Sequence, residues 1–316
     1  MRREAAAVSF SSDVKKELCR VSVKMKEIER SEAYGLLLFC RRFSPSEISM
    51  RTESGSAAER FADVTARTTG AVVELQKTLT ARKTGGAIYK AFVPSSDDCA
   101  RIFAQFGHDA SAPSLRVNMG NIEFEPCAAA FLRGAFLTCG TISSPESEYR
   151  LEFNTVHKNL SDDLCRVIKE TMELAGGRAA QPRVISRRGS YFVYLKDSDD
   201  IADLLTLMGA GSASMSIMQV KIEKSRENSM NRKINSQIAN TDKTVSAAAK
   251  QVRAIRTLEE NGVLTDLSGE LQAAAALRRD HPIASLKELV SLSPVPISKS
   301  GLNHRLNKLV ELAGEQ

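Results

Sequence analysis

Aromatic residues and long apolar runs are scarce in this sequence. Its 316 residues include no Trp, and aromatic side chains make up 5% of the chain. The chain therefore has few aromatic side chains on which the bases of a single strand could stack. No apolar run reaches the roughly eighteen residues of a membrane-spanning helix, so we expect none. The N-terminal stretch MRREAAAVSF is basic, and its apolar part is too short for a secretory signal.

Patterns of metal ligands and paired cysteines are also missing. The six Cys residues are scattered, with no C-x-x-C pair and no Cys and His cluster at zinc spacing. This usage is typical of a reducing compartment in which buried thiols are inert. We therefore expect a cytoplasmic protein that holds no metal and no cofactor.

The charge that is present is positive. The formal net charge is +6, which favours a polyanionic partner. From Lys221 onward there are 15 Lys and Arg and 11 Asp and Glu, so the last third carries +4 of this charge. The excess is concentrated in the C-terminal part.

The chain is organised around two similar apolar stretches. Residues 128–140, AAAFLRGAFLTCG, are typical of a buried helix with Gly134 at its centre. Residues 31–43, SEAYGLLLFCRRF, place Gly35 and Cys40 ninety-nine residues before Gly134 and Cys139. Gly inside a helix costs roughly 1 kcal/mol relative to Ala, a cost tolerated where another backbone comes close. The pattern predicts two helices packed face to face at a pseudo-twofold axis.

The segments after each helix repeat in the same order, which predicts a duplicated αββαββα unit and an α+β fold. The repeats span about residues 31–107 and 128–208, and Gly209 to Ser212 ends the pattern. We expect an N-terminal helical segment over residues 1–30, a repeat domain over 31–210, a helical connector over 211–240 and an all-α domain over 241–316. Asn240-Thr241-Asp242 predicts the cap of a new helix that ends at Glu260.

The last domain has the features of a helix-turn-helix. Ser268 to Asp280 predicts one helix, and the capping box at Ser285 predicts a short second one. Ser298 caps a third helix with Leu302, Leu306, Leu309, Val310 and Ala313 on its buried face. A short second helix and a third with a polar front are typical of DNA-binding units. A helical module that packs against protein is the alternative.

Polar side chains on the open face of the third helix suit a major groove. Arg and Lys recognise guanine, Asn recognises adenine, and Ser contacts base or phosphate. We expect the last helix to read bases through its N-terminal residues, Arg305 among them, and the second helix to meet phosphate. The predicted DNA-binding residues are Ser285, Lys287, Ser298, Lys299, Ser300, Asn303, His304, Arg305 and Lys308.

Basic residues also recur in the strands of both repeats. One hypothesis is that they line a concave sheet surface that contacts DNA, and the alternative is a solvated face. This candidate second surface consists of Lys77, Arg82 and Lys83 in the first repeat and Arg183, Arg187 and Arg188 in the second. For His157, His281 and His304 we favour exposed or capping roles over catalysis.

The duplicated unit and four sequence segments resemble known proteins. The duplicated unit resembles the fold of the LAGLIDADG homing endonucleases. SFSSDVKKELC, FLRGAFLTCGTISSPESEYRLEF, NTDKTV and SKSGLNHRLNKL resemble the WhiA family of bacterial regulators, from Ser9 almost to the end. The segment MRREAAAV before Ser9 departs from that family. The resemblance implies a LAGLIDADG-like domain joined to a helix-turn-helix, sequence-specific binding to double-stranded DNA on the nucleoid, and a role in sporulation, cell division or chromosome segregation.

The resemblance also makes a negative prediction. Homing endonucleases end each signature helix with an acidic residue that holds a divalent metal. Aligning LRGAFLTCG and AYGLLLFCR with that signature places Cys139 and Cys40 at the acidic positions. Neutral thiols are poor Mg²⁺ ligands, so we expect a degenerate, inactive nuclease. The alternative to a former metal site is that both Cys are small buried apolar side chains at helix ends.

Two other classes of function stay open. One is an active metal-dependent endonuclease whose acids come from Glu146 and Glu148, which we place in an exposed turn. The other is a protein-interaction scaffold, because the repeat domain could also bind another regulator or a division protein. No long heptad run argues for a coiled coil, and the sequence leaves the oligomeric state open.

Overall fold

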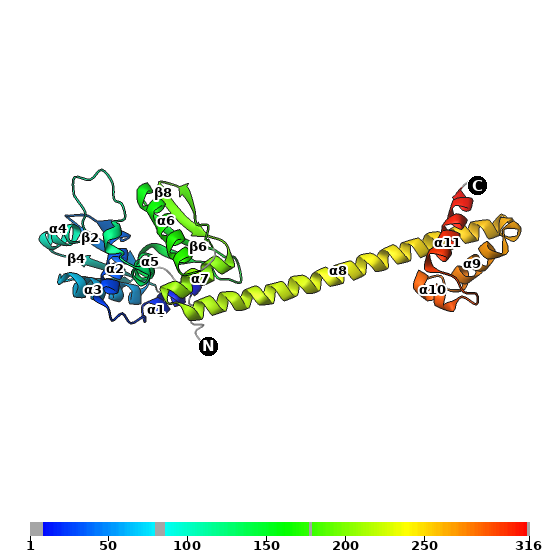
Figure 1. The fold of residues 1–316 in the computed structure, drawn as a ribbon, viewed down its shortest axis with the longest axis horizontal. Helices are drawn as coiled ribbons and strands as arrows, with labels where there is room; N and C mark the ends of the chain where they lie inside the picture. Colours follow the sequence, from blue (N-terminus) through cyan, green and yellow to red (C-terminus); the bar gives the residue numbers. More distant parts are fainter. Residues whose placement is uncertain (1–8, 80–85, 177–178, 315–316) are drawn as a thin grey trace. The chain divides into compact units, whose positions relative to one another are not determined.

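The computed structural model describes residues 9–79, 86–176 and 179–314. The chain divides into two compact units, Met1–Lys224 and Ser225–Gln316 (Figure 1). Helix α8 (Gly211–Glu260) begins in the first unit and ends in the second. The fold is α+β, as predicted.

The first repeat forms one antiparallel sheet with its helices. Its elements are α2 (Lys26–Leu38), β1 (Arg42–Phe43), β2 (Ile48–Thr52), α3 (Gly55–Thr69), β3 (Glu74–Leu79), β4 (Ala87–Val93) and α4 (Ser96–Gln105). The strands lie in the order β1-β2-β4-β3. On β4, Ala91 and Val93 are buried, whereas Lys90 is exposed. One face of the sheet therefore packs on the core and the other is open.

The second repeat has the same order of elements. They are α5 (Glu125–Cys139), β5 (Gly140–Ile142), β6 (Leu151–Thr155), α6 (Lys158–Leu174), β7 (Arg183–Arg187), β8 (Ser190–Leu195) and α7 (Ser198–Met208). The strands lie in the order β5-β6-β8-β7. The predicted αββαββα duplication is confirmed.

The two repeats meet where α2 crosses α5. A Cβ on Gly35 would lie 2.1 Å from the Phe131 carbonyl oxygen, and one on Gly134 would lie 2.3 Å from the Glu32 carbonyl oxygen. Leu36, Leu37, Phe136 and their neighbours on both helices are buried in one core. The predicted close pairing of these helices through glycine is correct.

A buried ion cluster lies beside this crossing. Glu32 is completely buried, and its carboxylate accepts hydrogen bonds from Arg133 on α5 at 2.8 Å and Arg60 on α3 at 2.7 Å. Arg133 also donates to the carbonyl of Met208, and Arg60 to the carbonyl of Val21. Both carboxylate oxygens are thus occupied, which compensates the loss of hydration.

The N-terminal helix α1 (Phe10–Leu18) belongs to the same unit. Ser9 caps it by accepting a hydrogen bond from the Ser12 N–H, and Val14 and Leu18 enter the common core. The Glu17 carboxylate accepts hydrogen bonds from the Ser212 and Ala213 N–H groups at the start of α8. An acidic side chain at this position satisfies unpaired helix donors and the helix dipole.

Two expected boundaries were wrong. The first core helix was expected to reach Phe43, but α2 ends at Leu38 and Arg42–Phe43 is strand β1. Pro45 disfavours helix at Ser44, whose N–H closes the β1–β2 turn on the Glu47 carbonyl.

The second wrong boundary is the helix start expected at Asn240. Helix α8 is continuous there, because no Pro or Gly interrupts residues 212–261 and cap-favouring residues are tolerated inside a helix.

The second unit contains α9 (Gly269–Asp280), α10 (Leu286–Leu292) and α11 (Lys299–Gly314). A short 3-10 helix, η2 (Val263–Asp266), precedes α9. The core joins the end of α8 to all three helices and consists of Ile255, Leu258, Ala274, Ala275, Leu289, Leu302, Leu306 and Leu309. This unit therefore has a hydrophobic core of its own.

Candidate nucleic-acid interface

Side-chain caps define the starts of α10 and α11 in the C-terminal unit. The Ser285 hydroxyl accepts from the Glu288 N–H at 3.3 Å, and the Glu288 carboxylate accepts from the Ser285 N–H at 2.7 Å. These hydrogen bonds hold the pKa of Glu288 below its usual value. At α11, the Ser298 hydroxyl accepts from the Gly301 N–H at 3.1 Å. The predicted capping box is present.

Arg278 fixes the turn between α9 and α10. Its side chain is almost completely buried, and Nη1 donates to the Ala284 carbonyl at 2.5 Å and the His281 carbonyl at 3.4 Å. Burial lowers the pKa of this guanidinium. The Nε atom of Arg278 has no hydrogen-bond partner among the described residues. The turn that positions α10 thus depends on one buried cation.

The polar front of α11 lies opposite its buried leucines. Leu302, Leu306 and Leu309 face the core, whereas Ser300 and His304 are exposed and Asn303 is half-buried. At 100° per residue, Ser300 and His304 lie close to the middle of the exposed arc, and Lys299 is exposed at the first residue of α11. Asn307 is exposed on the same arc and was missed by the sequence analysis, although the helical period could have identified it.

Arg305 is not at the centre of this front. Its guanidinium forms an ion pair of 2.8 Å with Glu270 on α9, and its side chain is 30% exposed. Lys308 is more exposed and pairs with Glu311 at 3.4 Å within α11. The two cations therefore occupy different environments, one between helices and one at the surface.

The expected phosphate contacts flank α11. Lys287 is exposed on α10, and Ser285 at its N-cap is half-buried. The cap hydrogen bonds use lone pairs of the Ser285 and Ser298 oxygens, so both hydroxyl groups keep the ability to donate. Ser298 and Ser300 lie with their hydroxyl oxygens 3.1 Å apart at the start of α11.

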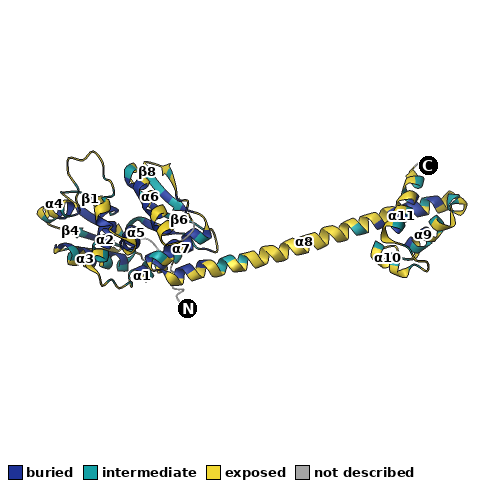
Figure 2. Ribbon diagram, in the orientation of Figure 1, coloured by how far each residue is buried: buried dark blue, intermediate teal, exposed yellow. Residues whose placement is uncertain are grey.

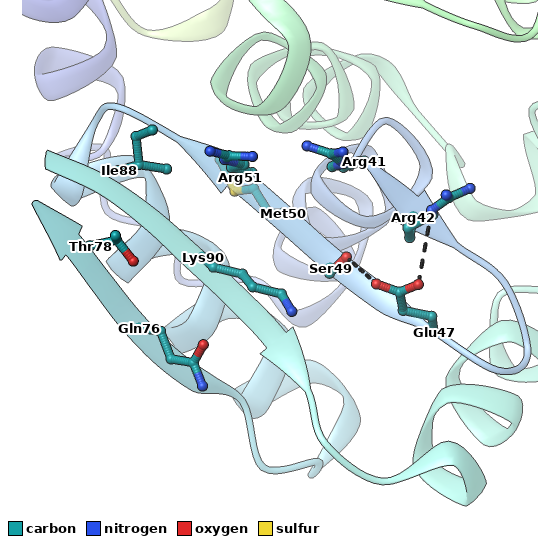
Figure 3. A pocket seen from close by; sticks show the side chains of 10 residues that line it. All are labelled: Arg41, Arg42, Glu47, Ser49, Met50, Arg51, Gln76, Thr78, Ile88 and Lys90. Carbon is teal, nitrogen blue, oxygen red and sulfur yellow. Dashed lines mark hydrogen bonds and ion pairs between the residues drawn. The ribbon is translucent and has the colours of Figure 1, made fainter. Parts of the chain in front are cut away.

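The open face of the first sheet carries a basic hollow of about 410 Å³ (Figure 3). By strand register Arg51 lies beside Lys90, which lies beside Gln76, and Arg42 lies beside Ser49. Its lining consists of Arg41, Arg42, Glu47, Ser49, Met50, Arg51, Gln76, Thr78, Ile88 and Lys90.

Most of the charge in this hollow is uncompensated. Arg42 lies 3.9 Å from Glu47, the single acidic residue in the lining. Within the described part of the chain, Arg41, Arg51 and Lys90 form no ion pair. These cations were not among the predicted DNA-contacting residues, because Arg51 and Lys90 share a face only through the pairing of β2 with β4.

The placement of Lys77 on a concave sheet surface was wrong. Register pairs Lys77 with Tyr89, and the Lys77 ammonium lies 5.7 Å from the centre of the Tyr89 ring. Tyr89 points to the helix side, because its ring lies 3.0 Å from where a Cβ on Gly55 of α3 would be. Lys77 is thus on the helix side of the sheet. Arg82 and Lys83 lie outside the described residues.

The second sheet places its predicted cations differently. Arg183 pairs in register with Tyr194, which points away from the buried Val193 and Leu195, so Arg183 and Arg187 lie on the open face. Arg188 (φ 49°) instead occupies the tight β7–β8 turn and is exposed. Arg150 stacks 4.9 Å from the Tyr194 ring and pairs with Glu152 at 2.7 Å.

Thiols occupy the ends of the two central helices. Burial raises the pKa of Cys139, the last residue of α5, to about 12, although nearby Lys15 opposes the shift. Burial likewise raises the pKa of Cys40 to about 12, and its Sγ donates to the Arg42 carbonyl at 2.8 Å. Both are neutral thiols near pH 7, which are poor ligands for Mg²⁺.

Glu146 and Glu148 are exposed in the turn between β5 and β6. Glu148 accepts a hydrogen bond from the Ser143 hydroxyl at 3.3 Å, and the Glu146 carbonyl accepts from Lys224 at 2.8 Å. Over the described residues, no group of three or more His, Cys, Asp or Glu has the arrangement of a metal site. No helix in the described ranges is long and apolar enough to span a membrane.

This geometry defines a class: a duplicated LAGLIDADG-like domain followed by a helix-turn-helix. Residues 128–227 match the WhiA LAGLIDADG-like domain, and residues 230–313 match the WhiA C-terminal HTH domain. The chain belongs to the WhiA family.

Relatives support this over nearly the whole length. The probable cell division protein WhiA of Alkaliphilus metalliredigens is 31% identical, with 98% of each chain covered. The protein of the same name in Symbiobacterium thermophilum is 32% identical over 97% of this chain and 98% of its own. The crystal structure of full-length DUF199/WhiA from Thermatoga maritima has a TM-score of 0.59 at 22% identity, covering 98% of this chain and 99% of that one.

Proposed function

We propose that this protein is a cytoplasmic, nucleoid-associated regulator that binds specific double-stranded DNA sequences and controls genes of cell division, chromosome segregation or sporulation. The observation that carries the proposal is the polar front of α11, opposite its buried leucines, next to a capped α10. A short second helix and a longer, polar third helix are the arrangement that enters a major groove.

The residues have distinct roles in this proposal. Ser300, Asn303 and His304 contact base edges, because they occupy the first turns of α11. Lys287, Lys299 and Lys308 contact phosphates, with the Ser285 and Ser298 hydroxyls as further donors. Arg305 reaches a base or phosphate only by leaving Glu270. An exposed pair of this kind is worth roughly 0.2–1 kcal/mol, so the exchange is inexpensive.

The repeat domain contributes a second basic surface rather than a nuclease centre. Arg41, Arg51 and Lys90 present uncompensated charge on an open face, which suits a DNA backbone. An acidic surface of another regulator or a division protein is the alternative ligand. Neutral thiols at Cys40 and Cys139 replace the carboxylates that two-metal cleavage requires.

The test is binding of labelled duplex DNA by the full chain and by a chain ending at Lys224, across a salt series with Mg²⁺. We expect specific binding to be lost with the C-terminal unit, while residual non-specific binding falls steeply with salt. Asn303→Ala with His304→Ala in the full chain should remove sequence preference. The double variant Arg51→Ala with Lys90→Ala should weaken binding to all DNA sequences equally.

Several outcomes would contradict parts of this proposal. If the chain ending at Lys224 kept its preference for specific sequences, the surface that recognises bases would lie in the repeat domain. Mg²⁺-dependent cleavage that disappears with Glu146→Gln or Glu148→Gln would identify an active endonuclease. Absence of salt-sensitive DNA affinity in the full chain would indicate a protein-interaction scaffold.

A further inference from the structure

The part of α8 that precedes the three-helix unit carries an exposed apolar line. Ile234, Ile238 and Val245 are 44%, 54% and 49% exposed, although each is a large aliphatic side chain. Figure 2 shows that most of α8 is exposed. With Asn231 and Thr241 they follow alternating steps of three and four residues. We call these five residues the α8 seam: Asn231, Ile234, Ile238, Thr241 and Val245.

The seam continues a face that is already buried. The same spacing leads to Ala248 and Ile255, which are each 2% exposed, and Ile255 packs in the core of the C-terminal unit. In coiled-coil notation Asn231, Ile238 and Val245 are a positions, and Ile234 and Thr241 are d positions. Two heptads of seam thus extend outward from a folded core.

This stretch of helix lacks internal support. It is rich in Asn and Ser, which are poor helix formers. Among the described residues, no ion pair joins charged side chains between 226 and 253, so the i,i+4 pairs that stabilise isolated helices are missing. A helix with little propensity and exposed apolar side chains, the aliphatic seam residues and the neighbouring Met230 among them, needs a surface to pack against.

The residues beside the seam indicate what that surface is. The e and g positions that flank it are Asn235, Gln237, Asp242 and Thr244, which are nearly uncharged. The basic side chains lie on the opposite face, at Arg232, Lys243, Lys250 and Arg253. An acidic partner helix would require cations beside the seam, whereas a second identical seam meets no like-charge conflict there.

We propose that the α8 seam pairs with the seam of a second copy of this chain as a short, parallel, in-register coiled coil. Asn231 supports this register, because a single Asn at an a position specifies alignment and two-strandedness. In such a pair, Gln237 of one copy faces Asp242 of the other, since g and following e positions meet across a parallel seam. Both three-helix units then follow the same end of the pair, an arrangement suited to two half-sites.

The experiment is analytical ultracentrifugation of the full chain without DNA, over a concentration series. We expect a reversible monomer–dimer equilibrium. Ile238→Lys should weaken dimerisation at least tenfold, because a seam side chain becomes charged. Ser236→Lys is the matched control: it adds the same charge on the outer face and should leave the equilibrium unchanged. Circular dichroism of both variants shows whether each is folded.

A second pair of variants tests the parallel register. Gln237→Lys should tighten the dimer about threefold through Asp242 of the partner copy, and Gln237→Glu should weaken it by a similar factor. Residues 237 and 242 do not face each other within one helix, so this opposition is specific to the pair. The proposal is overturned if the chain stays monomeric throughout, if Ile238→Lys acts no differently from Ser236→Lys, or if both Gln237 variants act alike.

Discussion

Gly35 and Gly134 face each other at the crossing of α2 and α5, and neither position has room for a Cβ. The neighbouring atoms are backbone, so a side chain cannot be accommodated by a rotamer change. Overpacking of this kind typically costs 1–3 kcal/mol and more where rigid backbone must move, so about 3 kcal/mol is a reasonable expectation for Gly134→Ala. Urea denaturation followed by circular dichroism measures the change.

The matched control is Gly211→Ala, at the first residue of α8, where a Cβ would meet nothing within 4 Å. Its stability should stay within about 0.5 kcal/mol of the parent. Equal effects of the two substitutions would show that close helix approach is not what Gly134 provides.

Glu32 leads to a second prediction. Its buried carboxylate holds Arg60 and Arg133, so Glu32→Ala leaves the buried Arg133 and the half-buried Arg60 without their counter-charge. Removing one member of a buried ion cluster typically costs about 3–5 kcal/mol. Calorimetry of the variant gives the loss. Arg67→Ala removes the exposed pairs of Arg67 with Glu29 and Asp63 and should cost under about 1 kcal/mol.

Arg305 and Glu270 allow a third prediction. If Arg305 leaves Glu270 to contact a base, Arg305→Ala weakens specific DNA binding by roughly 1–3 kcal/mol. Glu270→Gln should strengthen binding slightly, because it removes the competing partner and a negative charge. Lys308→Ala should lower affinity evenly across sequences and reduce the salt slope by about one. Unchanged affinity in Arg305→Ala would assign that residue to packing against α9.

His108 gives a prediction about pH. Burial lowers its pKa below the usual 6.5. Tyr34 accepts a hydrogen bond from the Asn118 N–H, so its own proton is available to His108 Nε2, 3.1 Å away, when the imidazole is neutral. The unfolded chain binds a proton below about pH 6.5 and the folded chain does not, so stability falls as pH drops from 6.5 towards the lower folded pKa.

His108→Gln isolates this contribution from the other titrating groups. The difference in unfolding free energy between parent and variant should change between pH 7 and pH 5, by at most about 1.4 kcal/mol per pH unit. A constant difference over that range would rule out His108 as the titrating group.

The repeat was visible in the sequence because both halves keep a Gly and a Cys at one fixed offset. The caps of α10 and α11 were equally local signals, since Ser285 and Glu288 are three residues apart. The side of a sheet on which a strand residue lies was harder to predict. Every residue of β3 is exposed, so it has no apolar alternation from which to assign Lys77 to a side.

Contacts between distant segments could not be derived from spacing. Arg51 and Lys90 become neighbours only through the register of β2 with β4. Glu270 precedes Arg305 by thirty-five residues, and neither position carries a pattern that identifies the other. The continuity of α8 was missed for a different reason, since Asn, Thr and Asp favour caps but do not end a helix by themselves.

The crossing of α2 and α5 has a consequence for synthesis on the ribosome. Gly134 is translated ninety-nine residues after Gly35, so the apolar face of α2 emerges long before its cover exists. At 5–20 residues per second this interval lasts about 5–20 s. A nascent first half would therefore present bare leucines to chaperones and to neighbouring chains, and truncated products should be aggregation-prone unless α5 has been completed.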